Sequence, residues 1–227
     1  ADGHVARARD LDRVATLEAR LERTRAEADK KMMQVRAAAD ERIARTQAEV
    51  DTRLETRRAE ADAATMQRQV KLDERTAKSE AQKNVVQVYR SSMSIAIQHR
   101  RDVLDNALQD FRQTQTTALN VRRAAIDAAL AARRSAVDAA EGIWKGKCNS
   151  TNKDERAAAN KTFRAAIQAA QKSYRESVDA AMNTYNTTMK QAKATRAAAE
   201  KQARERYQEN AKTARQTFQM AMKAAKK

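Results

Sequence analysis

The sequence predicts an all-α protein, and three features of its composition and patterning lead to that fold class. Its 227 residues include no proline and three glycines, whereas a globular chain of this length carries about ten prolines and about fifteen glycines. Alanine, arginine, lysine, glutamate and glutamine dominate, and all are strong helix formers. Side chains also recur every eleven residues. Because aromatics make up 4% of the chain, we expect thin apolar stripes on long helices.

The C-terminal third shows the repeat most clearly. From Asn160 the pieces read NKTFRAAIQAA, QKSYRESVDAA and MNTYNTTMKQA, and three more follow. One column is aromatic except at Arg196, the column four residues later is mostly aliphatic except at Glu200, and a third is alanine throughout. Eleven residues make three helical turns, so each column stays on one face. We expect hairpin packing by Phe163, Ile167, Tyr174, Val178, Tyr185, Met189, Tyr207, Phe218 and Met222.

The same period occurs upstream. Residues 24–78 align aspartates at every eleventh position, and a middle block beginning DNALQDFRQTQ aligns leucines. We expect the aromatic column to pack on the aliphatic residues of this middle block, Leu108, Leu119, Ile126, Leu130 and Val137. A reversal centred near residue 148 predicts that partner numbers sum to roughly 296, which puts Phe163 near Leu130 or Val137.

The predicted architecture is a very long helix followed by an antiparallel C-terminal helix, together forming an elongated eleven-residue-repeat (hendecad) coiled coil. We divide it into an N-terminal helix (1–78), its continuation (79–141), a glycine-containing hairpin loop (142–152) and a returning helix (153–227), with Thr151 or Asn152 as the N-cap. The segment SEAQKNVVQVYRSSM, residues 79–93, interrupts the repeat but contains no glycine or proline, so we expect the helix to continue. A bend near Ser91 and Ser92, giving three helices, is the alternative.

The returning helix is too short to cover residues 1–78. The apolar stripe of this N-terminal helix should therefore pair with another chain, giving a homo-oligomer or homopolymer. The predicted self-association residues are Leu17, Leu21, Met32, Ile43, Val50 and Leu54.

The charge distribution leaves a second functional class open. The chain carries a net charge of +16, and residues 149–227 hold 17 basic and 7 acidic residues. A basic helical module that binds nucleic acid or an anionic membrane surface is the alternative function. Two distant histidines, one cysteine and no glycine-rich phosphate loop predict no enzyme, no metal site, no cofactor and no small-molecule substrate.

Several single positions carry further predictions. Cys148 lies in the expected loop between lysine and asparagine and is the candidate residue for an intermolecular disulfide. Asn149, Asn160 and Asn186 match the glycosylation pattern. Because the sequence opens Ala-Asp-Gly, as after signal-peptide cleavage, we expect a secreted or cell-surface protein. No apolar run is long enough for a transmembrane span.

In period and composition, the alanine- and lysine-rich helices resemble those of the late embryogenesis abundant proteins that carry eleven-residue repeats. The resemblance implies protection of membranes or proteins on drying. Those proteins are poor in large apolar residues, whereas this chain fills its columns with Phe, Tyr, Leu, Ile and Met. The prediction we favour is a structural, non-catalytic coiled-coil subunit that assembles into a filament or an extracellular or surface fibrous structure.

Overall fold

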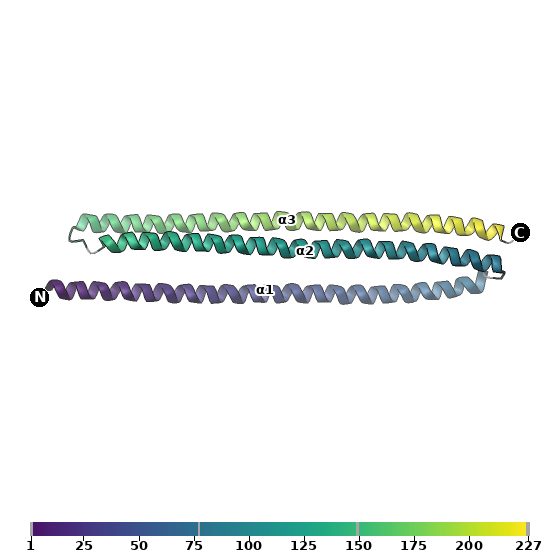
Figure 1. The fold of residues 1–227 in the computed structure, drawn as a ribbon, viewed down its shortest axis with the longest axis horizontal. Helices are drawn as coiled ribbons and strands as arrows, with labels where there is room; N and C mark the ends of the chain where they lie inside the picture. The colour runs from purple at the N-terminus through teal and green to yellow at the C-terminus, as the bar shows by residue number, and fades with distance from the viewer. Residues whose placement is uncertain (1, 77, 149, 226–227) are drawn as a thin grey trace. The chain divides into compact units, whose positions relative to one another are not determined.

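A computed structural model of the chain consists of three long helices. It describes residues 2–76, 78–148 and 150–225, and within the first helix it describes the side chains of residue 16 and of residues 18–76. The helices are α1 (Asp2–Thr76), α2 (Glu80–Lys147) and α3 (Lys153–Ala224), and no strand occurs among the described residues (Figure 1). The all-α prediction is confirmed.

The chain divides into two compact units, residues 1–71 and residues 72–227. The first unit is most of α1, whose described polar side chains largely interact along the helix itself. Arg45 pairs with Glu41 four residues earlier at 2.8 Å, and the hydroxyls of Thr46 and Thr52 donate to the carbonyls of Arg42 and Ala48. Such i,i+4 contacts add only a few tenths of a kcal/mol each, roughly 0.2 to 0.5, so high helix propensity along the sequence is the main local support for α1.

The prediction of one continuous helix through residue 79 is wrong. α1 ends at Thr76, and α2 begins after Ser79, whose hydroxyl accepts a hydrogen bond from the backbone N–H of Gln82 at 3.3 Å. The Gln82 side chain in turn accepts from the backbone N–H of Lys78 at 3.0 Å. This arrangement resembles a capping box, the S-x-x-Q pattern that starts a helix without glycine or proline. Ser91 and Ser92, the alternative bend, lie inside α2.

The second unit is a helical hairpin in which α2 and α3 run side by side in opposite directions (Figure 1). The reversal is shorter than the predicted 142–152, because α2 continues through Gly142 and Gly146 to Lys147. Both glycines have helical neighbours and open space where a Cβ would lie. α3 starts at the expected N-cap, Asn152, whose side chain accepts from the backbone N–H of Asp154 at 2.9 Å.

The core of the hairpin is thin and built largely from alanine. Twelve apolar residues are buried among those described. Seven of them belong to α3 and are all alanines or methionines, and most of the rest are alanines. Val86, at 1% exposure, is the most deeply buried large side chain. The buried alanines include three of the column predicted from the sequence, Ala170, Ala181 and Ala203. Small side chains let two helix backbones approach closely, so that larger residues lie at the edges of the contact.

Candidate functional site

The most regular feature of the hairpin is a ladder of six side-chain contacts between α2 and α3. On α3 the ladder uses the predicted aromatic column, including its Arg196 member. On α2 it uses a second column with the same spacing of eleven. The contacting pairs are Tyr89 with Phe218, Arg100 with Tyr207, Phe111 with Arg196, Arg122 with Tyr185, Arg133 with Tyr174, and Trp144 with Phe163.

The four inner steps of the ladder are cation–π contacts. The guanidinium carbons of Arg100, Arg122 and Arg133 lie 5.3, 4.8 and 5.5 Å from the centroids of the tyrosine rings opposite them. At the fourth step the chemistry is reversed, because Arg196 of α3 lies 5.6 Å from the ring of Phe111 on α2. Each such contact stabilises by about 0.5 to 2 kcal/mol, depending on how far the cation is desolvated.

The two outer steps pair aromatic rings. Tyr89 and Phe218 have centroids 4.9 Å apart with tilted planes, and Trp144 stacks on Phe163 at 5.6 Å. The indole N–H of Trp144 also donates to Asn160 Oδ1 at 2.8 Å. Aromatic pairs of this geometry contribute about 0.5 to 1.5 kcal/mol beyond the area they bury. The ladder therefore ends in apolar contacts that cap its charged steps.

Arg196 and Glu200, which interrupt two columns of the repeat, form an ion pair. Arg196 Nε lies 2.8 Å from Glu200 Oε1, and both side chains are more than a third exposed. The Arg196 guanidinium thus contacts the Glu200 carboxylate on its own helix and lies over the Phe111 ring of α2 at the same time. Arg196, which looks like a defect in the repeat, therefore forms a ladder step in which the cation lies on α3 and the aromatic ring on α2.

The register of the hairpin differs from the predicted one. In every ladder step the two residue numbers add to 307, as for 163 and 144, instead of roughly 296. Residues level with one another across the loop add to 300, because α2 ends at 147 and α3 begins at 153. The observed total exceeds this value by seven. The two residues of each contact are therefore offset along the helix axis by about 10 Å, so each side chain has to reach about 5 Å. Side chains lean toward the N-terminus of their own helix, which in an antiparallel pair shifts contacts in this direction.

The chemistry of the α2 partners also differs from the expectation. Phe163 contacts Trp144 instead of Leu130 or Val137, and three tyrosines lie under arginines instead of aliphatic side chains. The signal for this α2 column is present in the sequence, as an aromatic or arginine at every eleventh position from 89 to 144. Tyr89 lies inside the segment 79–93 and keeps the spacing of eleven residues. That segment therefore changes the residue types of the repeat but not its period.

The predicted hairpin-packing residues lie at or near the α2–α3 interface to different extents. Met189, Met222 and Leu119 are buried. The others are half-buried: Phe163, Ile167, Tyr174, Val178, Tyr185, Tyr207, Phe218, Leu108, Ile126, Leu130 and Val137.

The predicted self-association residues all belong to α1. Met32, Ile43, Val50 and Leu54 are half-buried, and Leu21 is exposed at 39%. The Leu17 side chain lies outside the described residues.

Cys148 caps the C-terminus of α2. Its backbone N–H donates to the Trp144 carbonyl at 2.8 Å, and its half-buried thiol donates to the Lys145 carbonyl at 3.4 Å. Of the predicted glycosylation positions, Asn160 and Asn186 are exposed on α3, and Asn149 lies outside the described residues.

Two searches of the described part of the chain bear on other functions. It contains no group of three or more His, Cys, Asp or Glu side chains placed to hold a metal ion. None of its helices combines the length and the apolar character needed to cross a membrane. Comparison with protein-family models, curated proteins and solved structures finds no match to this chain.

Proposed function

We propose that this chain is a structural, non-catalytic subunit whose helices form a hendecad coiled coil and which assembles with copies of itself into a filament or a fibrous surface structure. The observation that carries the proposal is the constant register of the ladder. Six contacts keep the same total of residue numbers from position 89 to position 144 of α2. An eleven-residue period of 3.67 residues per turn supports nearly straight packing of this kind.

A straight hairpin suits a structural role because its stabilising contacts are spread evenly along its length. The ladder spans 55 residues of α2, or about 80 Å at 1.5 Å per residue. Each eleven-residue step repeats one cation–π or aromatic contact beside a column of small residues. As in other repeat architectures, stability then grows with the number of steps, and length can be changed without redesigning a globular core.

Self-assembly is the second part of the proposal. The apolar stripe on α1 that includes Met32, Ile43, Val50 and Leu54 has the eleven-residue spacing that another helix of the same kind can match. Exposed or half-covered apolar stripes of this length favour association between chains. A homo-oligomer or homopolymer therefore fits the repeat better than an isolated chain, and a secreted or surface location fits a fibrous assembly.

The contacts of the aromatic column argue against a base-stacking platform for nucleic acid. Such a platform needs open ring faces. Tyr174, Tyr185 and Tyr207 each have one ring face turned to an arginine of α2 and are half-buried in the hairpin. The rings are therefore used for holding the two helices together. Binding of anions through charge alone is an outcome that the experiment below distinguishes.

The proposal is tested by measuring the mass and shape of the purified full chain at micromolar concentration and near-physiological salt. Light scattering coupled to size exclusion should give masses above that of one 25.4 kDa chain, and electron microscopy should show elongated particles or fibres. A stable compact monomer would contradict the proposal. A chain that is largely disordered by circular dichroism in dilute buffer would favour desiccation protection instead. A monomer that binds DNA or anionic vesicles with steep salt dependence would favour the binding module.

A further inference from the structure

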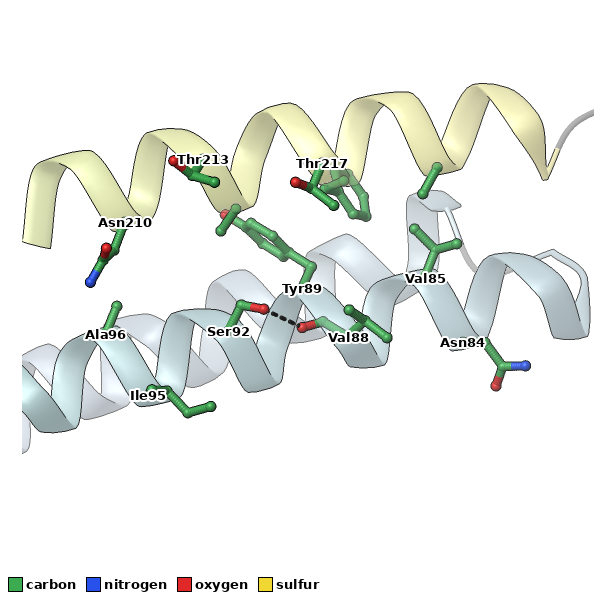
Figure 2. A pocket seen from close by; sticks show the side chains of 13 residues that line it. Asn84, Val85, Val88, Tyr89, Ser92, Ile95, Ala96, Asn210, Thr213 and Thr217 are labelled. Atoms are coloured by element: carbon green, nitrogen blue, oxygen red, sulfur yellow. Dashed lines mark hydrogen bonds between the residues drawn. The ribbon is translucent and has the colours of Figure 1, made fainter.

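A row of grooves follows one face of the α2–α3 hairpin. Four of them have volumes of about 520, 460, 490 and 350 Å³, and they lie beside the ladder steps of Tyr89, Phe111, Arg122 and Trp144. Their lining residues fall in the same eleven-residue columns on both helices, so the grooves are repeats of one shape along one face. Figure 2 shows the largest, with Val88, Tyr89 and Ile95 contributed by α2 and Thr213 and Thr217 by α3.

The grooves carry the exposed large apolar side chains of α2. Val88, Ile95, Val121 and Ile143 are 61, 68, 56 and 62% exposed, and all four line these grooves. They are the large hydrophobic residues of α2 that are exposed within the described part of the chain. Between them the groove floors are mainly alanine, as at Ala96 and Ala214 in the first groove. Apolar rims over small residues form a surface on which another helix can lie closely.

The groove walls carry fewer charged residues than the chain as a whole. None of the thirteen described residues that line the largest groove is charged, and one of the eleven described for the groove beside Arg122 is charged, Arg122 itself. The grooves beside Phe111 and Trp144 each carry one acidic and one basic residue, Asp110 with Arg196 and Glu155 with Lys147. Charged residues make up 33% of the chain. Depletion of charge is the compositional mark of the centre of a protein interface, and solvated helix faces do not show it.

We propose that this groove face is the contact surface between two copies of the chain. Each copy carries a net charge of +16, so two copies repel one another on most faces, and this face, which is poor in charge, is where they approach at least electrostatic cost. Nucleic acid or an acidic protein would instead favour walls with a strong excess of positive charge, whereas the three basic and two acidic residues of these four grooves nearly cancel. The inference rests on the proposed self-assembly and names the surface that mediates it.

The contact is isologous, with the same face presented by both copies about a two-fold axis across the hairpin. This antiparallel arrangement sets the Val88 and Ile95 end of one copy against the Ile143 end of the other. Between the groove beside Tyr89 and the groove beside Phe111, the volume falls to about 40 Å³. There His99 Nε2 and Arg206 Nη1 lie 3.3 Å apart and join α2 to α3 across the groove. The two ends are therefore separate apolar contact areas, and each packs against the opposite end of the second copy.

The test compares charge insertions inside and outside the grooves, measured by sedimentation equilibrium of the full chain. Val88→Lys with Val121→Lys should weaken self-association by at least about tenfold, because each lysine becomes a buried, unpaired charge. Met182→Lys with Met220→Lys adds the same two charges at side chains that are 37 and 66% exposed and are not among the residues lining the grooves, so it is the matched control and should leave self-association unchanged. Thermal melts at low concentration should be alike for all three chains, since these positions face solvent in one copy.

Each result identifies which idea fails. If the wild-type chain is monomeric, both the proposed assembly and this surface are wrong. If it assembles and the groove variant assembles equally well, the groove inference is wrong while the proposed function stands. Loss of assembly on Leu21→Lys with Ile43→Lys, with no effect of the groove variant, would place the contact on α1. The orientation has its own test: Asn84→Cys should cross-link to Cys148 of a second copy on oxidation, and cross-linking of the wild type through Cys148 alone would overturn the antiparallel arrangement.

Discussion

Phe111 and Arg196 form the one ladder step in which ring and cation have exchanged helices, and this step allows a charge-swap test of the ladder. Phe111→Arg places two guanidinium groups opposite one another, about as far apart as the present 5.6 Å contact. Phe111→Arg combined with Arg196→Tyr instead recreates the arrangement of Arg122 over Tyr185. The single variant should be clearly less stable than the double variant.

The size of the effect follows from the geometry. Two unit charges 5.6 Å apart repel by about 0.7 kcal/mol in water and by about 3 kcal/mol at an effective dielectric constant of 20. The Arg196 side chain is 36% exposed and paired with Glu200, so a value of about 1 to 2 kcal/mol is expected. Loss of the cation–π contact adds about 0.5 to 1 kcal/mol. The single variant should therefore lose about 1.5 to 3 kcal/mol of unfolding free energy.

The double variant should recover most of this loss. It removes the repulsion and restores one cation–π contact, and it gives up only the partly exposed ion pair of Arg196 with Glu200, which is worth about 0.3 to 0.5 kcal/mol. We expect its unfolding free energy to lie within about 1 kcal/mol of the wild type. The coupling between the two substitutions should then be about 1.5 kcal/mol or more in favour of the pair.

Urea unfolding followed by tryptophan fluorescence is the appropriate assay. Trp144 is the one tryptophan of the chain, and its ring stacks on Phe163 within the hairpin, so its emission reports on the α2–α3 contact. All four members of the cycle are compared at one protein concentration, because any self-association would add to the apparent stability. Gln109→Arg, which adds the same charge at an exposed position of α2, controls for net charge. Additive effects of the two substitutions, within about 0.5 kcal/mol, would refute the ladder as a set of specific contacts.

Two further predictions concern the ends of the helices. Gly142→Ala and Gly146→Ala should each stabilise α2 by about 0.5 to 1 kcal/mol, because both glycines are helical and a Cβ meets open space; a lower melting temperature would show that this turn is not helical. Ser79→Ala and Asn152→Ala should each cost about 1 kcal/mol through loss of an N-cap, whereas Ser79→Asp should be nearly neutral, and equal losses for alanine and aspartate at 79 would contradict the cap.

The sequence alone determined the features that depend on one helix at a time. The absence of proline and the abundance of helix formers predict the all-α fold, and the eleven-residue period identifies which residues share a face, including Tyr174, Tyr185 and the alanine column. The reversal near residue 150 and its cap at Asn152 follow from local turn chemistry. The end of α1 at Thr76 is also encoded locally, in the Ser79 and Gln82 pair, but this signal contains neither glycine nor proline, the residues that usually mark a helix break.

The tertiary structure decided how the two faces meet. The eleven-residue period assigns Tyr185 and Arg122 each to a column of its own helix. Whether the two side chains meet depends on the axial offset between α2 and α3. That offset combines the length of the loop with the lean of every side chain toward its own N-terminus, which moves each contact by seven residue numbers from the level position. The open grooves likewise exist only where two helices lie together, because alanine columns bring the backbones close and leave Val88, Ile95 and Ile143 at the rim. Relations between helices depend on distances that no single stretch of sequence contains.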